Sequence, residues 1–159
     1  MSNHTLSEKI QSFYNQNTEL FLKLGHSSEG SIHRSIWAYG VSDRHEALHY
    51  VDNQICKLLL KLHSDSVPHI VDLGCGVASS LCYIESEISV TGLGITISEE
   101  QCKLAKHRIN KNGFSEKLQC LQGDFCKLPK NLEKADLAFS IEAFVHAQSA
   151  GAFFHQVSS

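Results

Sequence analysis

Residues 70–78, IVDLGCGVA, combine a short apolar run with an acidic residue and two glycines at its end. An apolar run of this kind is typical of a buried strand, and glycines let a ligand lie close against the backbone of the following turn. Asp72 places a carboxyl group just ahead of the glycines, where it attracts a cation and repels a pyrophosphate. The stretch therefore predicts a site for a ligand with a positive charge near the turn.

Three ligands of a glycine turn can be compared on these residues. A nucleoside triphosphate loop needs G-x-x-x-x-G-K-[ST], and no lysine follows this turn. A dinucleotide loop ends in a small residue where Ser79 stands here, and Thr96 occupies the position of the ribose-binding acid. A dinucleotide stays an alternative. S-adenosylmethionine has an ammonium and a sulfonium and no phosphate, so it suits Asp72 best.

The ends of the later strands add to this interpretation. IVDLGCGVA resembles the first motif of the class I S-adenosylmethionine-dependent methyltransferases, with Ala78 in place of the third glycine. VTGLGITISEEQ (90–101) resembles the second-strand segment of the branch that contains the cyclopropane fatty-acid synthases and sterol C-methyltransferases. QGDF (122–125) and ADLAFSIEAFVHA (135–147) are similar to the next two strand ends of that branch. The resemblance covers about residues 30–155.

This resemblance implies a role for each matching residue. Thr96 and Gln101 are expected to contact the ribose, and Asp124, followed by Phe125, the adenine amino group. IHRSIWAYG (32–40) is similar to a lid segment with the pattern H-x-G-x-W, in which Ser35 replaces the glycine. The expected cofactor-binding residues are Trp37, Asp72, Gly74, Cys75, Gly76, Thr96, Gln101, Asp124, Phe125 and Ser140.

Glu142 and His146 are the candidate catalytic residues. They are expected one helical turn apart after the fourth strand, where both could serve as acid-base or substrate-positioning groups. No arginine pair lies near them to hold a phosphate or carboxylate. We therefore expect an apolar acceptor, such as a sterol, prenyl or acyl chain, with Glu142 as the base. The expected apolar wall consists of Phe139, Phe144, Val145, Phe153 and Phe154.

Strands that alternate with helices from residue 67 onward predict an α/β, Rossmann-like, doubly wound parallel sheet. Strands are expected at 69–73, 88–95, 117–124 and 135–141, with helices at 78–86 and 98–113 between them. Residues 1–66 are expected to form an N-terminal helical lid, with helices at 6–24 and after the capping pair Ser42 and Asp43. Residues 67–159 are expected to form the cofactor-binding domain.

The resembled fold has seven strands in the order 3-2-1-4-5-7-6, so four strands would leave the fourth at an open edge. This predicts an incomplete domain, which is a fragment, a truncated product, or a chain that an oligomer or a complementing chain completes. A second hypothesis follows from the open edge: a catalytically inactive remnant or interaction subunit that pairs through it.

Composition narrows the partners. The net charge of -3 and the pI near 6.3 argue against nucleic acid as a partner. No signal peptide or apolar run of membrane-spanning length is evident, so a cytoplasmic protein is expected. The six cysteines form no C-x-x-C pair and are expected to be reduced and buried. His45 and His49 lack a third ligand, and no metal is expected.

Overall fold

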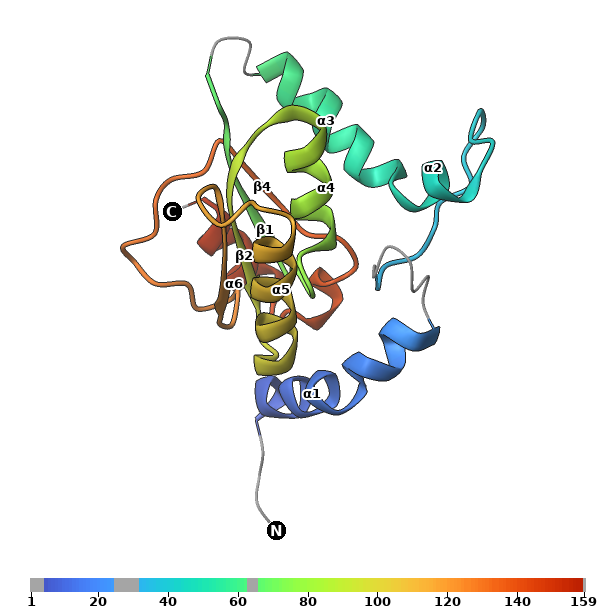
Figure 1. The fold of residues 1–159 in the computed structure, drawn as a ribbon. Coiled ribbons are helices and arrows are strands. Elements are labelled where there is room, and N and C mark those ends of the chain that lie inside the picture. Colours follow the sequence, from blue (N-terminus) through green and yellow to red (C-terminus); the bar gives the residue numbers. More distant parts are fainter. Residues whose placement is uncertain (1–4, 25–31, 63–65, 159) are drawn as a thin grey trace.

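The computed structural model describes residues 5–24, 32–62 and 66–158. Its centre is a parallel sheet of four strands in the order β3-β2-β1-β4 (Figure 1). The strands are β1 (His69–Leu73), β2 (Thr91–Thr96), β3 (Leu118–Gln122) and β4 (Leu137–Phe139). The predicted α/β doubly wound fold is confirmed. Because all strands run parallel, their carboxyl ends meet at one edge, where ligands bind in such sheets.

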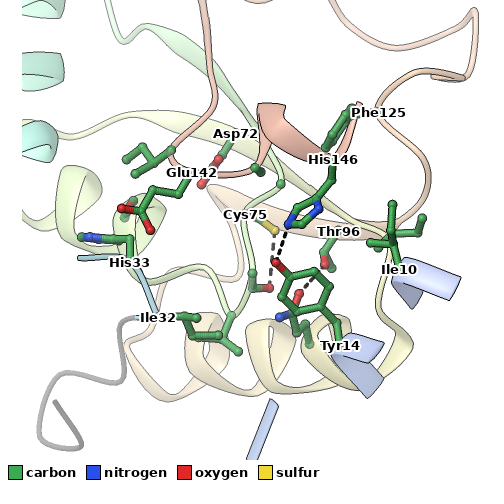
Figure 2. Close-up of a pocket in the computed structure, with 18 of the residues that line it drawn as sticks. Ile10, Tyr14, Ile32, His33, Asp72, Cys75, Thr96, Phe125, Glu142 and His146 are labelled. Carbon is green, nitrogen blue, oxygen red and sulfur yellow. Dashed lines mark hydrogen bonds between the residues drawn. The ribbon is translucent and has the colours of Figure 1, made fainter. Parts of the chain in front are cut away.

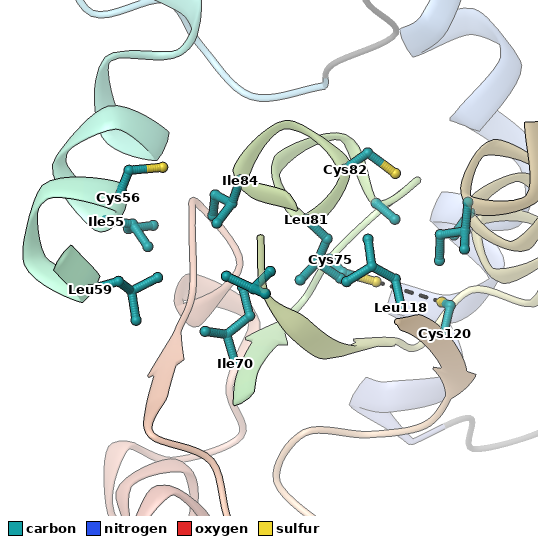
Figure 3. Packing of buried hydrophobic residues seen from close by; sticks show 14 of the residues in the cluster. Ile55, Cys56, Leu59, Ile70, Cys75, Leu81, Cys82, Ile84, Leu118 and Cys120 are labelled. Carbon is teal, nitrogen blue, oxygen red and sulfur yellow. Dashed lines mark hydrogen bonds between the residues drawn. The ribbon is translucent and has the colours of Figure 1, made fainter. Parts of the chain in front are cut away.

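Helices cover both faces of the sheet. The helices α3 (Tyr50–Leu62), α4 (Ser79–Ile88) and α5 (Glu99–Lys111) pack on one face, and α6 (Ala150–Val157) packs on the other. Successive residues of β1 serve the two faces, since Ile70 joins the first core and Val71 the second. Figure 3 shows Ile70 of β1 meeting Ile55 and Leu59 of α3 and Ile84 of α4.

The N-terminal helices follow the predicted pattern with one difference. The helix α1 spans Leu6–Leu24, as expected. Asp43 caps the next helix, where its side chain accepts a hydrogen bond from the amide of Glu46. That helix is divided into α2 (Arg44–Leu48) and α3 by His49, a buried residue with φ -91° and ψ 15°. The imidazole of His49 lies 2.8 Å from the carboxylate of Asp52 in the first turn of α3.

The region after β3 differs most from expectation. β4 has only three residues, and they are half-buried, because β4 pairs with β1 alone and lies at the sheet edge. A 3₁₀ turn, η1 (Phe144–His146), follows in place of the expected helix. The helix α6 was not predicted; Ser149 caps it, and Phe153 is its buried anchor.

The six cysteines are all free and buried, which confirms the prediction. Within the described residues, no helix has the length and apolar character needed to cross a membrane.

Candidate active site

The glycine turn after β1 is fixed to the neighbouring strand. The amides of Gly74 and Cys75 both donate to the carbonyl of Ile95 in β2, at 2.8 and 2.9 Å. These two amides are therefore not available to a ligand. Gly74 and Gly76 have φ values of 97° and 54°, a left-handed conformation that glycine adopts without strain.

The two glycines serve different purposes. A Cβ at Gly74 would lie 2.1 Å from the Cβ of Ala143, so Gly74 permits the segment after β4 to pack against the turn. A Cβ at Gly76 would meet only the Ile32 side chain, at 3.9 Å. Gly76 thus exposes backbone to a cavity, and Gly74 brings the two strand ends together.

That cavity lies where the carboxyl ends of the strands meet (Figure 2). Ten of the predicted residues line it: both members of the catalytic pair, Glu142 and His146, and eight of the cofactor set, namely Asp72, Gly74, Cys75, Gly76, Thr96, Gln101, Asp124 and Phe125. Among the described residues, no lysine or arginine contributes to its wall. The described cavity wall therefore offers carboxylates, hydroxyls and imidazoles, and no lysine or arginine that could neutralise a pyrophosphate.

Asp72 is the buried acid of the site, with 3% of its surface exposed. Burial raises the pKa of its carboxyl well above the usual range, and the nearby charges of Asp52 and Cys120 add to the effect. A carboxylate in this environment gains most from a cationic ligand, because the ligand's charge replaces the lost solvation. Asp72 can thus bind an ammonium or sulfonium group.

The predicted ribose-binding pair is already joined. The Thr96 hydroxyl donates to Oε1 of Gln101 at 2.8 Å, and both side chains are buried. Ser98 caps α5 by accepting from the Gln101 amide at 3.1 Å, so the pair sits at the start of a helix. With Oε1 engaged, the Gln101 NH₂ group is the donor left for a ligand hydroxyl.

Asp124 follows β3 and lies beside Phe125 in the cavity wall. Its Oδ1 accepts from the amide of Cys126 at 2.9 Å, and its Oδ2 accepts from the hydroxyl of Ser7 at 3.0 Å. A residue of α1 thus contacts the expected adenine site.

Glu142 and His146 both line the cavity but are not related by a helical turn. Glu142 has φ 57°, a left-handed value that strains a residue other than glycine, and His146 ends the 3₁₀ turn η1. At Glu142 the chain that leaves β4 changes direction, and the next residue, Ala143, packs against Gly74 of the glycine turn.

Tyr14 is a site residue that the sequence did not reveal. Its hydroxyl lies 2.8 Å from Nε2 of His146, and Figure 2 shows the two rings meeting across the cavity. Burial raises the pKa of Tyr14, and the charge of Glu142 raises it further. The only sequence signal was its place on the apolar face of the first helix, which equally suits a core residue.

Three predicted features lie elsewhere. Trp37 does not line the cavity, and 63% of its surface is exposed; Ile32 and His33 of the same segment line it instead. Ser140 donates to the carbonyl of Leu73 at 2.7 Å, so it supports the turn from outside the wall. The expected phenylalanines do not line the cavity, because Phe144 packs on Phe153 of α6, Phe153 packs on its neighbour Phe154, and Phe139 packs against the first core. The apolar wall consists of Ile10, Ile32, Val77, Ile97 and Ile141.

Comparison with known proteins identifies the family. The model of the family described as "Methyltransferase domain" matches residues 70–159, more than half of the chain. The chain belongs to this methyltransferase family. The resemblance to class I enzymes near the sterol C-methyltransferase branch is thereby confirmed, and the strands that carry it are β1 to β4.

Curated methyltransferases match over much of this chain. Sterol 24-C-methyltransferase ERG6B of Gibberella zeae is 33% identical over 151 residues, which are 91% of this chain and 36% of that protein. Norajmaline N-methyltransferase of Rauvolfia serpentina is 29% identical over 89 residues, 56% of this chain and 30% of that protein. The chain thus spans about a third of the length of these relatives.

Among solved structures, the [4+2]-cyclase SpnF superposes with a TM-score of 0.75 at 19% identity, over 97% of this chain and 55% of that one. At this identity the match shows the fold alone. The name of this neighbour also shows that a shared fold does not establish methyl transfer, which has to be argued from the site.

Proposed function

We propose that the chain binds S-adenosylmethionine in the cavity and transfers its methyl group to a small acceptor beside Glu142 and His146. One observation carries this proposal. A single cavity joins the glycine turn after β1, with Asp72 behind it, to the polar residues after β4. A methyltransferase needs this arrangement, because donor and acceptor must be held together in line.

The cavity residues fit this cofactor better than a dinucleotide. Asp72 is a buried acid that gains from a cationic ligand, and Gly76 leaves backbone open beside it. Gln101 and Asp124 supply a donor and an acceptor for a nucleoside further along the cavity. No described lysine or arginine in the wall could hold a pyrophosphate. The ligand that suits this set is a nucleoside with a cationic chain.

The bound cofactor supplies an electrophilic methyl group on a sulfonium, and the residues of this chain orient the acceptor and move a proton. The raised pKa of Tyr14 favours the protonated phenol, which donates to Nε2 of His146 in the tautomer that leaves this nitrogen unprotonated. The phenol oxygen can then accept a proton from an acceptor hydroxyl or amine while it passes its own to His146. For an alkene acceptor, Glu142 is the carboxylate that removes the proton.

We propose a largely apolar acceptor such as a sterol, prenyl or acyl chain. Isoleucines from three segments, Ile10, Ile32 and Ile141, form much of the apolar wall, and no arginine among the described lining residues could bind an anionic headgroup. The sterol methyltransferase among the relatives supports this class, whereas the N-methyltransferase among them supports an amine.

A methyl-transfer assay with labelled cofactor separates these acceptors. We expect transfer to a sterol or prenyl acceptor, with a loss of roughly a hundredfold in the Glu142→Gln variant. Transfer to amines or phenols alone would contradict the proposed acceptor, as would an unchanged rate in Glu142→Gln.

The sheet edge at β4 supports a second proposal, pairing with another polypeptide. Within the described part of the chain β4 pairs only with β1, and Val145 and Phe154 in the elements that follow it are 78% and 59% exposed. Light scattering after size exclusion tests this. A dimer without transfer activity would favour an interaction subunit, and an active monomer would remove that alternative.

A further inference from the structure

A chain of hydrogen bonds ties α1 to the expected adenine end of the cavity. Nε2 of Gln148 donates to the Ser7 hydroxyl at 2.8 Å, and the Ser7 hydroxyl donates to Oδ2 of Asp124 at 3.0 Å. Ser7 is 117 positions from Asp124 and 141 from Gln148, so only the fold brings the three together. Ser7 and Asp124 both line the cavity.

These contacts fix the Asp124 carboxylate at both oxygens. Oδ1 accepts from the Cys126 amide at 2.9 Å, and Oδ2 accepts from Ser7. An ionised carboxylate has about four acceptor positions, so roughly two of them stay available. The two hydrogen bonds restrain the rotation of the carboxylate, which presents acceptors. A ligand edge that carries an amino group matches it, and an edge that carries a carbonyl oxygen does not.

Ser7 is itself held in position. The Ser7 hydroxyl accepts a hydrogen bond from Gln148, and this contact orients the hydroxyl proton of Ser7 toward Asp124. The helix that carries it is fixed at a second point, where Oδ1 of Asn15 accepts from the Ser98 hydroxyl at 2.7 Å. The position of Ser7 therefore depends on α1 being docked on the rest of the domain.

We propose that Ser7, oriented by Gln148, positions the Asp124 carboxylate for the exocyclic amino group of adenine, which makes α1 part of the adenine site. This inference rests on the proposed function, because it requires an adenosine cofactor in the cavity. Ser7 acts through Asp124 and is a positioning residue. Removal of the Ser7 hydroxyl should reduce the discrimination between adenine and other nucleobases more than it reduces the overall affinity for the ligand.

The test compares two ligands that differ at one substituent of the base. S-adenosylhomocysteine carries the amino group, and S-inosylhomocysteine carries an oxygen in its place. Calorimetry gives the ratio of their affinities for the wild type and for Ser7→Ala, Ser7→Thr and Ser12→Ala. Ser12 is a matched control, since it lies on the exposed face of the same helix, where its hydroxyl accepts from Gln16.

We expect the wild type to prefer the adenine ligand at least about tenfold, since a site built for a donor rejects an analogue that lacks it. Ser7→Ala should narrow this preference by about three- to tenfold, while Ser7→Thr and Ser12→Ala keep it. Gln148→Ala should narrow the preference by a similar factor. If the double variant Ser7→Ala/Gln148→Ala narrows it no further than Ser7→Ala alone, the result would support the hydrogen-bond chain.

Two outcomes would overturn the inference alone. One is an unchanged preference in Ser7→Ala, and the other is tighter binding of the adenine ligand, which would mean that Ser7 competes with adenine. The first outcome includes an equal loss of affinity for both ligands, because the preference is then unchanged and helix docking alone explains the loss. Failure of the wild type to bind S-adenosylhomocysteine would instead overturn the proposed function.

Discussion

The hydroxyl of Tyr14 lies 2.8 Å from Nε2 of His146, and the two rings meet edge to face at 85°. The pair connects α1 to the turn after β4, and both residues line the cavity. The proposed catalytic group therefore includes Tyr14 beside Glu142 and His146, because His146 is engaged by a residue 132 positions away.

Replacement of Tyr14 by phenylalanine should slow methyl transfer to a hydroxyl or amine acceptor by about a hundredfold, the usual contribution of a positioned proton-transfer group. The affinity for S-adenosylhomocysteine should stay the same, because the ring is retained. Single-turnover rates and calorimetry measure the two effects. Tyr83→Phe is the control, since Tyr83 bonds Asn53 outside this cavity. An equal loss in both variants would contradict a role for Tyr14.

Asp72 should make stability and cofactor affinity depend on pH in opposite directions. Its folded pKa is raised by burial and by Asp52 and Cys120, so its contribution to stability is present below the unfolded pKa and is lost as pH rises through the folded pKa. The affinity for S-adenosylhomocysteine should rise over the same range, because the ionised carboxylate attracts the ligand's ammonium.

Urea unfolding and calorimetry between about pH 5 and pH 8 test this prediction. In Asp72→Asn both dependences should become weaker. A wild type whose affinity falls as pH rises would show that Asp72 does not bind the cationic end of the ligand.

Gly74 should tolerate no side chain, because a Cβ there would overlap the Cβ of Ala143. Gly74→Ala should lower the free energy of unfolding by about 3 kcal/mol or more, through backbone strain and the clash together. Gly113→Ala is the matched control, because Gly113 has φ 76° with open space around it. The control should cost only about 1 kcal/mol, the strain alone. If denaturant unfolding shows the same loss of unfolding free energy for Gly74→Ala and Gly113→Ala, the contact with Ala143 does not explain the cost at Gly74.

Glu142 should show a trade between stability and activity. It is exposed and left-handed at φ 57°, so Glu142→Gly should raise the free energy of unfolding by about 1 kcal/mol while methyl transfer is lost. Ser89→Gly at φ 46° is the control: it relieves similar strain far from the cavity and should leave transfer unchanged. If Glu142→Gly keeps the wild-type rate, the strain at this residue has no catalytic purpose.

The sequence predicted the parts of the fold that local patterns determine. The strand before Gly74, the Ser98 cap and the α1 boundaries each depend on a few adjacent residues, and all three appear in the structure. The break at His49 could not be predicted, because the apolar spacing of residues 47–59 continues across it. β4 is shorter than the apolar run at 135–141, because only three of its residues pair with β1, and the extent of that pairing cannot be read from the run itself.

Some residues of the candidate site could be predicted from local sequence, and others depend on how distant elements pack. Residues directly after a strand, such as Asp72 and Asp124, line the cavity as predicted, because parallel strands end at one edge. Tyr14 and Ser7 were missed because only the docking of α1 places them there. Trp37 was expected from a motif, but the segment that carries it directs Ile32 and His33 to the cavity.

The central claim is that the cavity behind Gly76 is a site for S-adenosylmethionine, and calorimetric titration with S-adenosylhomocysteine tests it most directly. We predict saturable binding at one site per chain, weakened about tenfold or more in Asp72→Ala, with no binding of NAD. An absence of heat and of any shift in melting temperature at millimolar ligand, or binding of NAD in its place, would contradict the account.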